Sequence, residues 1–145
     1  AGELLKKAPP HDYIITAESK GIPLVYEMSR QLEKNNYLVA RKSEKLYMKN
    51  VFSVSVKSIT TSQVQTLFID GDDVDKMRGK RVLLIDDVIS TGESLKALEK
   101  LVEKAGGKVA AKMAILAEGK AASRKDIIFL NPLPLFTSTG EPIWD

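Results

Sequence analysis

Two adjacent carboxylates, Asp86 and Asp87, follow an apolar run, and a turn of small polar residues comes after them. Residues 82–85 predict a buried parallel strand, and residues 90–94 lead into a segment with helical spacing. In open α/β sheets, ligands bind beyond the carboxyl ends of strands, and the free N–H groups of a helix N-terminus bind phosphate. The two carboxylates would repel a phosphate but suit vicinal hydroxyls or a hydrated Mg²⁺. Together these residues predict a sugar-phosphate ligand.

This stretch, VLLIDDVISTGES, resembles the 5-phosphoribosyl-1-pyrophosphate (PRPP) motif of the type I phosphoribosyltransferases. The resemblance implies that Asp86 and Asp87 hold the ribose hydroxyls and, directly or through water, a Mg²⁺ cofactor. It implies a 5-phosphate site built from five consecutive residues, which are Ser90, Thr91, Gly92, Glu93 and Ser94. Strands that end in Asp-Asp also occur in receiver domains, where an aspartate is phosphorylated, and polar strand ends can lack any function. A receiver domain and a polar strand end without function therefore remain as alternatives.

A second anion loop is predicted where Glu18, Ser19, Lys20 and Gly21 separate the first strand from its helix. The four residues resemble the Glu-Ser-Arg-Gly pyrophosphate loop of adenine phosphoribosyltransferases. Lys20 stands in the arginine's place, which keeps the charge but loses the bidentate geometry. The resemblance implies pyrophosphate binding by Glu18, Ser19 and Lys20. An ordinary strand-to-helix turn with a solvated lysine is the alternative.

Three cations, Arg41, Lys42 and Lys45, follow the next predicted strand. They suit a pyrophosphate leaving group, because negative charge builds up there as the glycosidic bond breaks. The same family has an Arg-Lys pair and a nearby Lys-Leu, matched here by Arg41-Lys42 and Lys45-Leu46. Arg41 and Lys45 are therefore electrostatic candidates for catalysis, whereas no residue is identified as a general acid or base. A solvated basic loop is the alternative.

A β-hairpin is predicted over residues 51–69, because apolar and polar residues alternate on both sides of a polar tip. We expect it to close over the site and its tip, residues 58–62, to be mobile without ligand. The tip lacks the Glu-Tyr-Gly of adenine-specific enzymes and is closer to the Ser-Phe-Thr-Lys lid of bacterial xanthine phosphoribosyltransferases. Residues 21–32, GIPLVYEMSRQL, are in contrast more similar to the adenine enzymes. Adenine is therefore the first choice of base and xanthine the alternative.

The order of the predicted elements is β-α-β, interrupted by the hairpin before the motif strand. Strands are predicted at residues 12–16, 37–40, 82–85, 109–116 and 127–130, helices at 23–31 and 95–105, and a charged connector at 71–79. This order predicts an α/β, doubly wound, mainly parallel sheet with helices on both faces and a β-hairpin lid. At 145 residues the chain should form one domain, residues 1–145. It starts without Met in the tail of a helix, so we expect that an upstream hood segment, which grips the base, is absent.

The composition excludes several other classes of protein. The chain has no cysteine, so it has no disulfide and no thiol nucleophile, which fits a cytoplasmic location. Its formal net charge is +3 and its basic residues are scattered. Nucleic-acid binding is therefore not expected, unless a DNA-binding segment lies upstream. No P-loop, dinucleotide-binding loop or membrane-spanning run occurs. His11 is the only histidine, which argues against a Ser-His-Asp triad, and Phe136 and Trp144 suit a core edge better than base stacking.

The family resemblance implies a Mg²⁺-dependent transferase that moves the 5-phosphoribosyl group of PRPP to a purine base. Its partners would be PRPP and the purine, and a homodimer is expected. A regulatory domain that binds PRPP without transfer is the alternative from a different class, motivated by the altered lid.

Overall fold

Five parallel strands form the central sheet of the computed structural model, which describes residues 1–58 and 61–144. The strand order is β2-β1-β5-β6-β7. The strands are β1 (Tyr13–Ala17), β2 (Tyr37–Ala40), β5 (Arg81–Ile89), β6 (Lys108–Glu118) and β7 (Ile128–Leu133). The predicted α/β class and mainly parallel sheet are therefore confirmed.

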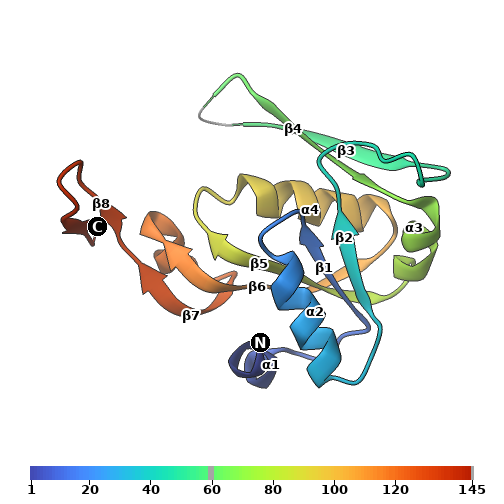
Figure 1. Cartoon of the computed structure of the whole chain (residues 1–145), viewed down its shortest axis with the longest axis horizontal. Coiled ribbons are helices and arrows are strands. Elements are labelled where there is room, and N and C mark those ends of the chain that lie inside the picture. Colours follow the sequence, from blue (N-terminus) through green and yellow to red (C-terminus); the bar gives the residue numbers. More distant parts are fainter. Residues whose placement is uncertain (59–60, 145) are drawn as a thin grey trace.

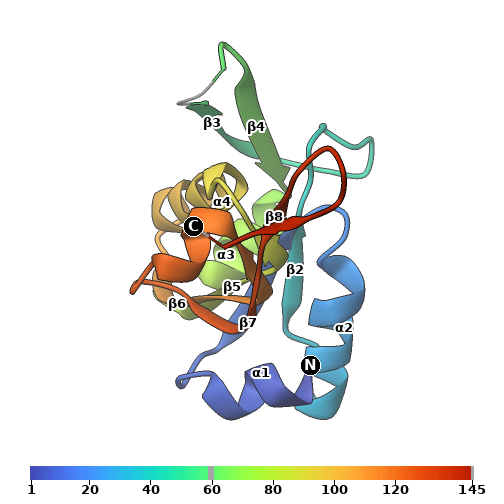
Figure 2. The same ribbon diagram turned by 90° about the vertical axis from the view of Figure 1, so that its left-hand side faces the viewer.

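Helices cover both faces of the sheet, as expected. They are α1 (Gly2–Lys7), α2 (Ile22–Gln31), α3 (Gly71–Met77) and α4 (Glu93–Lys104), with a short 3₁₀ helix, η1 (Gly119–Ser123). Figure 2 shows α2 and α4 on opposite sides of the sheet. Because side chains alternate along a strand, β5 supplies Leu83 and Ile85 to the α2 face and Val82 and Leu84 to the α4 face. All four are fully buried, which explains the continuous apolar run before the carboxylates.

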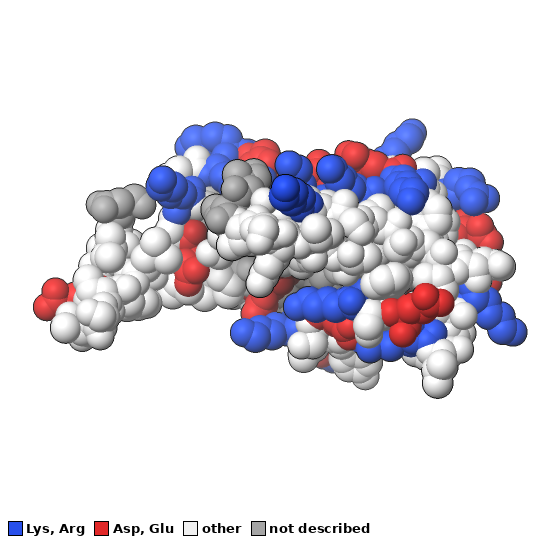
Figure 3. Space-filling model, turned by 90° about the horizontal axis from the view of Figure 1, so that it is seen from above, with Lys and Arg blue, Asp and Glu red and all other residues white. Residues whose placement is uncertain are grey.

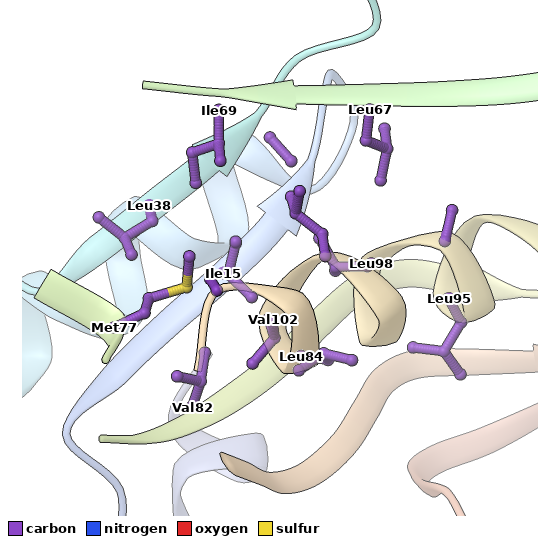
Figure 4. Packing of buried hydrophobic residues seen from close by; sticks show 14 of the residues in the cluster. Ile15, Leu38, Leu67, Ile69, Met77, Val82, Leu84, Leu95, Leu98 and Val102 are labelled. Atoms are coloured by element: carbon purple, nitrogen blue, oxygen red, sulfur yellow. The ribbon is translucent and has the colours of Figure 1, made fainter. Parts of the chain in front are cut away.

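The predicted hairpin consists of β3 (Phe52–Lys57) and β4 (Val64–Ile69), which are antiparallel. It packs on the outside of α4 (Figure 1), and Leu67 and Ile69 point from β4 into the core beside Leu98 (Figure 4). Lys104 of α4 adds a hydrogen bond of 2.9 Å to the carbonyl of Ser53. The hairpin is thus a third layer over this face. The predicted mobility of the tip concerns residues that lie partly outside the described part of the chain.

The structure corrects two predictions and adds one element. Residues 71–77 form helix α3 instead of a plain connector, because Val74 and Met77 are spaced for one helical face and both are buried. Strand β5 continues to Ile89, so the two aspartates lie inside it and not beyond it. The chain ends in a small hairpin of β8 (Leu135–Phe136) and β9 (Pro142–Ile143), which projects from the sheet in Figure 1.

None of the helices in the described residues combines the length and apolar character needed to cross a membrane.

Candidate functional site

The turn between β5 and α4 contains the residues for which an anion site is predicted. Gly92 immediately precedes α4 and has a left-handed backbone, with φ of +80°, which glycine adopts without the penalty of a β-carbon. Gly92 also has no side chain that could cap the helix, and the Glu93 N–H makes only a long contact of 3.5 Å with the Thr91 hydroxyl, so the first turn of α4 can still donate to a ligand. A pocket of about 100 Å³ opens here, lined by Asp86 and by residues 88–95. It contains all five residues predicted to bind the 5-phosphate.

The two aspartates differ in their relation to this pocket, although their carboxyl groups lie close enough to interact. Asp86 lines the pocket, whereas Asp87 is not among its lining residues. An Asp86 carboxylate oxygen accepts the backbone N–H of Asp87 at 2.8 Å. Burial, together with the neighbouring Asp87, raises the pKa of Asp86 to about 7. Burial and the adjacent acid therefore favour the protonated form of Asp86.

The basic loop after β2 is held by a carboxylate from the loop after β1. The Glu18 carboxylate accepts the backbone N–H of Lys42 at 2.6 Å and an Arg41 guanidinium N–H at 3.3 Å, and Lys45 lies 4.0 Å away. The Lys42 hydrogen bond and these two cations keep the pKa of Glu18 below its ordinary value. The two loops predicted to bind pyrophosphate are therefore brought together. Glu18 itself faces cations, which gives it the geometry of a loop anchor.

The remaining predicted residues of these loops face solvent. Ser19, Lys20 and Lys42 are exposed, and within the described residues the Lys20 ammonium has no hydrogen-bond or ion-pair partner. Lys42 is close enough to Asp86 to act on its carboxyl electrostatically. The basic loop therefore faces the acidic strand end across the carboxyl edge of the sheet. Leu46, which the family pattern includes, is fully exposed.

The hairpin touches both sides of this site. Its tip end bonds to the first turn of α4, where Ser58 donates to the Glu93 carboxylate at 2.6 Å and the Gln65 amide donates to the Ser94 hydroxyl at 3.0 Å. At its base, Arg41 and Phe68 exchange backbone hydrogen bonds of 2.8 and 2.7 Å. A hollow of about 350 Å³ lies between the hairpin, Lys42 and Glu93.

Two contacts of the phosphate turn were missed by reasoning from the sequence. The Ser90 hydroxyl donates to the Glu118 carboxylate at 2.8 Å, at the end of β6. The Arg124 guanidinium lies against Gly92, where Nη1 is 2.6 Å from the position that a β-carbon would occupy. Both partners are about 30 residues away in the chain and belong to no motif, so no sequence signal indicates them.

The donor set suits a divalent cation that shares its coordination with a ligand. The described residues contain no group of three or more acidic or histidine side chains that could hold a metal ion. Mg²⁺ commonly binds through one or two carboxylates and completes its shell with water and substrate phosphates. Asp86 and Asp87 fit that pattern. Figure 3 shows that lysines and arginines are interspersed with acids on the face that carries the hairpin, without one continuous positive patch.

Comparison with known proteins matches most of the chain to one family model, described as "Phosphoribosyl transferase domain", over residues 3–131. Adenine phosphoribosyltransferase of Thermosipho africanus is 33% identical over 117 residues, which are 81% of this chain and 65% of the relative. Hypoxanthine/guanine phosphoribosyltransferase of Methanotorris igneus is 33% identical over 109 residues, covering 75% of this chain and 55% of the relative.

Solved structures show the same similarity. The crystal structure of adenine phosphoribosyltransferase from Thermoanaerobacter pseudethanolicus superposes with a TM-score of 0.74 at 26% identity, covering 90% of this chain and 77% of the other. The chain spans 65% and 62% of the lengths of two bacterial adenine phosphoribosyltransferases that it matches. The matched region extends beyond residues 12–117, in which the motifs lie, toward both ends.

Proposed function

The chain belongs to the phosphoribosyltransferase domain family, and from this premise we propose that it is a Mg²⁺-dependent purine phosphoribosyltransferase. It transfers the 5-phosphoribosyl group of PRPP to a purine nitrogen and yields a nucleoside 5′-monophosphate and pyrophosphate. The observation that carries the proposal is the junction of β5 and α4. It brings Asp86 and the N-terminus of α4 together in one pocket, with Asp87 next to Asp86 and Lys42 of the basic loop near enough to act on it.

Each part of the site has one task in this proposal. Asp86 and Asp87 hold the ribose hydroxyls, and the turn of residues 90–94 holds the 5-phosphate through backbone N–H groups. Arg41, Lys42 and Lys45, with the loop of Glu18, Ser19 and Lys20, receive the pyrophosphate. In the transfer, a purine nitrogen forms a bond to the anomeric carbon as the bond to the pyrophosphate oxygen breaks, and that oxygen keeps the electron pair. The purine loses its N–H proton to solvent water.

The protein accelerates this step by placement and electrostatics. The transition state resembles an oxocarbenium ion, so positive charge grows on the ribose while negative charge grows on the leaving pyrophosphate. The Arg41 and Lys45 side chains stabilise the second of these charges. Mg²⁺, when bound with PRPP near Asp86 and Asp87, would neutralise part of the pyrophosphate charge. Glu18 holds the basic loop in position by accepting the Lys42 N–H.

Adenine is the proposed base, because the first half of the chain and the Thermosipho relative both point to it. Xanthine is second, on the composition of the hairpin tip. We further propose that the protein forms a homodimer, that residues 1–145 act as one PRPP-binding domain, and that it works in the cytoplasm. Size-exclusion chromatography with light scattering tests the dimer directly.

The test is to incubate the full chain with PRPP, Mg²⁺ and one of adenine, guanine, hypoxanthine or xanthine, and to measure pyrophosphate release. We expect release with adenine above the other bases. Calorimetry of PRPP binding accompanies the assay. Binding without turnover on any base would instead support a PRPP-sensing regulator, and absence of binding at millimolar PRPP would reject both functions.

A pair of variants links the activity to the proposed site. Asp87→Asn should weaken PRPP binding with little change in melting temperature, because a carboxylate at the ligand edge contributes little to folding. Asp72→Asn is the matched control, since Asp72 is exposed on α3 and makes the same change in charge. Equal affinities in the two variants would contradict the role of Asp87.

A further inference from the structure

An arginine outside every predicted motif lies behind the phosphate turn. Arg124 follows η1, and its Nη1 atom fills the space in which a β-carbon on Gly92 would stand, 2.6 Å from that position. A side chain at position 92 would therefore meet the guanidinium, in addition to the cost of the left-handed backbone. Arg124 and Gly92 are thus in contact, although they lie 32 residues apart in the sequence.

The guanidinium is fixed in this position by an ion-pair network. Its Nε and Nη2 atoms donate to the two carboxylate oxygens of Asp126 at 2.9 and 2.7 Å. Asp126 also accepts from Lys112 of β6 at 3.2 Å, and Lys112 donates to Glu99 of α4 at 3.3 Å. Such a bidentate pair restricts the guanidinium in position and in plane. The network therefore ties the segment after η1 to both β6 and α4.

The network leaves one part of the guanidinium uncommitted. Asp126 occupies the Nε and Nη2 side, whereas Nη1, on the side of Gly92, donates a hydrogen bond to no residue in the described part of the chain. The Arg124 side chain is 33% exposed, so the group is partly withdrawn from solvent. A fixed cationic N–H group directly behind an anion-binding turn strengthens the attraction for a phosphate without reorganisation on binding.

We propose that Arg124 is a positioning residue for the 5-phosphate of the substrate. It holds the Gly92 turn in its phosphate-binding conformation and adds positive charge behind the turn. The inference rests on the proposed function, because it assumes that a phosphorylated ribose binds at residues 90–94. It assigns to this turn an electrostatic partner that lies outside the PRPP motif.

The experiment compares binding of ribose 5-phosphate and of pyrophosphate with Mg²⁺ to the full chain by calorimetry. Arg124→Met removes the charge but keeps a long side chain against Gly92. We expect about tenfold weaker ribose 5-phosphate binding, the scale of one charge acting across several ångströms of partly screened medium. Pyrophosphate affinity should stay unchanged, because the basic loop is intact. Arg30→Met is the matched control, since Arg30 also forms a bidentate pair, with Glu27 on α2, and should leave both affinities unchanged.

The dependence on salt separates electrostatic positioning from plain structural support. Ribose 5-phosphate binding by Arg124→Met should fall less steeply with salt than binding by the wild type, because one cation fewer contributes. An unchanged ribose 5-phosphate affinity would overturn the proposal, and so would an equal loss for both ligands accompanied by a lower melting temperature. If Arg124→Met does not fold, Arg124→Lys is measured instead. A ribose 5-phosphate affinity of Arg124→Lys within about threefold of the wild-type value, with the same salt dependence, supports a charge effect. A larger loss of affinity in a variant that melts at the wild-type temperature contradicts it.

The proposed function and this inference fail in different ways. Wild-type protein that binds neither PRPP nor ribose 5-phosphate would remove both. If wild-type protein and Arg124→Met bind ribose 5-phosphate equally tightly, only the proposed role of Arg124 is rejected.

Discussion

The side-chain amide of Gln65 donates a hydrogen bond of 3.0 Å to the hydroxyl of Ser94, which joins β4 of the hairpin to the first turn of α4. A hydroxyl that accepts one hydrogen bond can still donate its own hydrogen. Gln65 therefore leaves the Ser94 hydrogen available to a phosphate in the pocket. This contact connects the hairpin directly to the proposed ligand site.

Gln65→Ala should weaken PRPP binding by a small factor, because the Ser94 hydroxyl loses the partner that orients it. One neutral hydrogen bond contributes about 1 kcal/mol, which corresponds to roughly fivefold in affinity. Calorimetry measures the change. Ser55→Ala is the control, since the Ser55 hydroxyl bonds at 2.9 Å to Thr66 within the hairpin. If Ser55→Ala weakens PRPP binding as much as Gln65→Ala does, general loosening of the hairpin is responsible.

PRPP binding should depend on pH through Asp86. The pKa of this carboxyl is about 7 in the free protein, and we expect the ionised form to bind the ribose hydroxyls and Mg²⁺. The ionised fraction rises from about a tenth at pH 6 to about nine tenths at pH 8, so affinity should rise about tenfold. Binding by Asp86→Asn, measured over the same range, corrects for titration of PRPP itself. A wild-type profile parallel to that of the variant would contradict the prediction.

The same carboxyl should lower stability at high pH. Its folded-state pKa lies above the ordinary aspartate pKa of 3.8, so its ionisation destabilises the folded state as pH rises from about 4 to 7. Asp86→Asn should therefore raise the free energy of unfolding at pH 8 by roughly 1–2 kcal/mol, after allowance for partial solvent screening. At pH 4 the two proteins should be about equal. Urea denaturation at both pH values measures the difference.

Glu18→Ala should weaken pyrophosphate binding more than Glu18→Gln does. Glutamine keeps an acceptor for the Lys42 N–H, whereas alanine leaves the basic loop without its anchor. The lowered pKa of Glu18 means that its carboxylate stabilises the fold above about pH 4.5, and this contribution is lost as pH falls through the folded-state value. Competition between pyrophosphate and PRPP reports the affinities. If both variants bind alike, the charge of Glu18 matters and the hydrogen bond does not.

Leu67→Ala should detach the hairpin from α4. Leu67 is fully buried between β4 and α4, and truncation of such a side chain costs about 2–5 kcal/mol. Denaturation measures the loss, and faster hydrogen exchange in β3 and β4 would locate it. Val64→Ala on the same strand is the control, because Val64 is 59% exposed. Equal losses in the two variants would show that the hairpin is not held by the Leu67 contact.

The sequence was informative where the determinants of structure are local. The strand, the aspartates, Gly92 and α4 follow one another in one stretch, so their order predicts the phosphate turn. Helix α3 was missed because it is only seven residues long, and a short charged segment has little helical preference until Val74 and Met77 are buried. The contacts of Arg124 with Gly92 and of Glu118 with Ser90 depend on the packing of β6 and η1, which no local pattern encodes.

The backbone pairing of Arg41 with Phe68 also limits how the molecule can associate. Strand β2 lies at the border of the sheet, and Leu38 and Ala40 direct their backbone groups toward β1. The backbone groups that face outward are therefore those of Tyr37, Val39 and Arg41. Those of Arg41 already form hydrogen bonds with Phe68 of β4. Two outward residues offer too short a template for another strand, and exposed strand borders are a common route to aggregation. The attachment of the hairpin thus also protects the β2 border of the sheet against unwanted extension by a second chain.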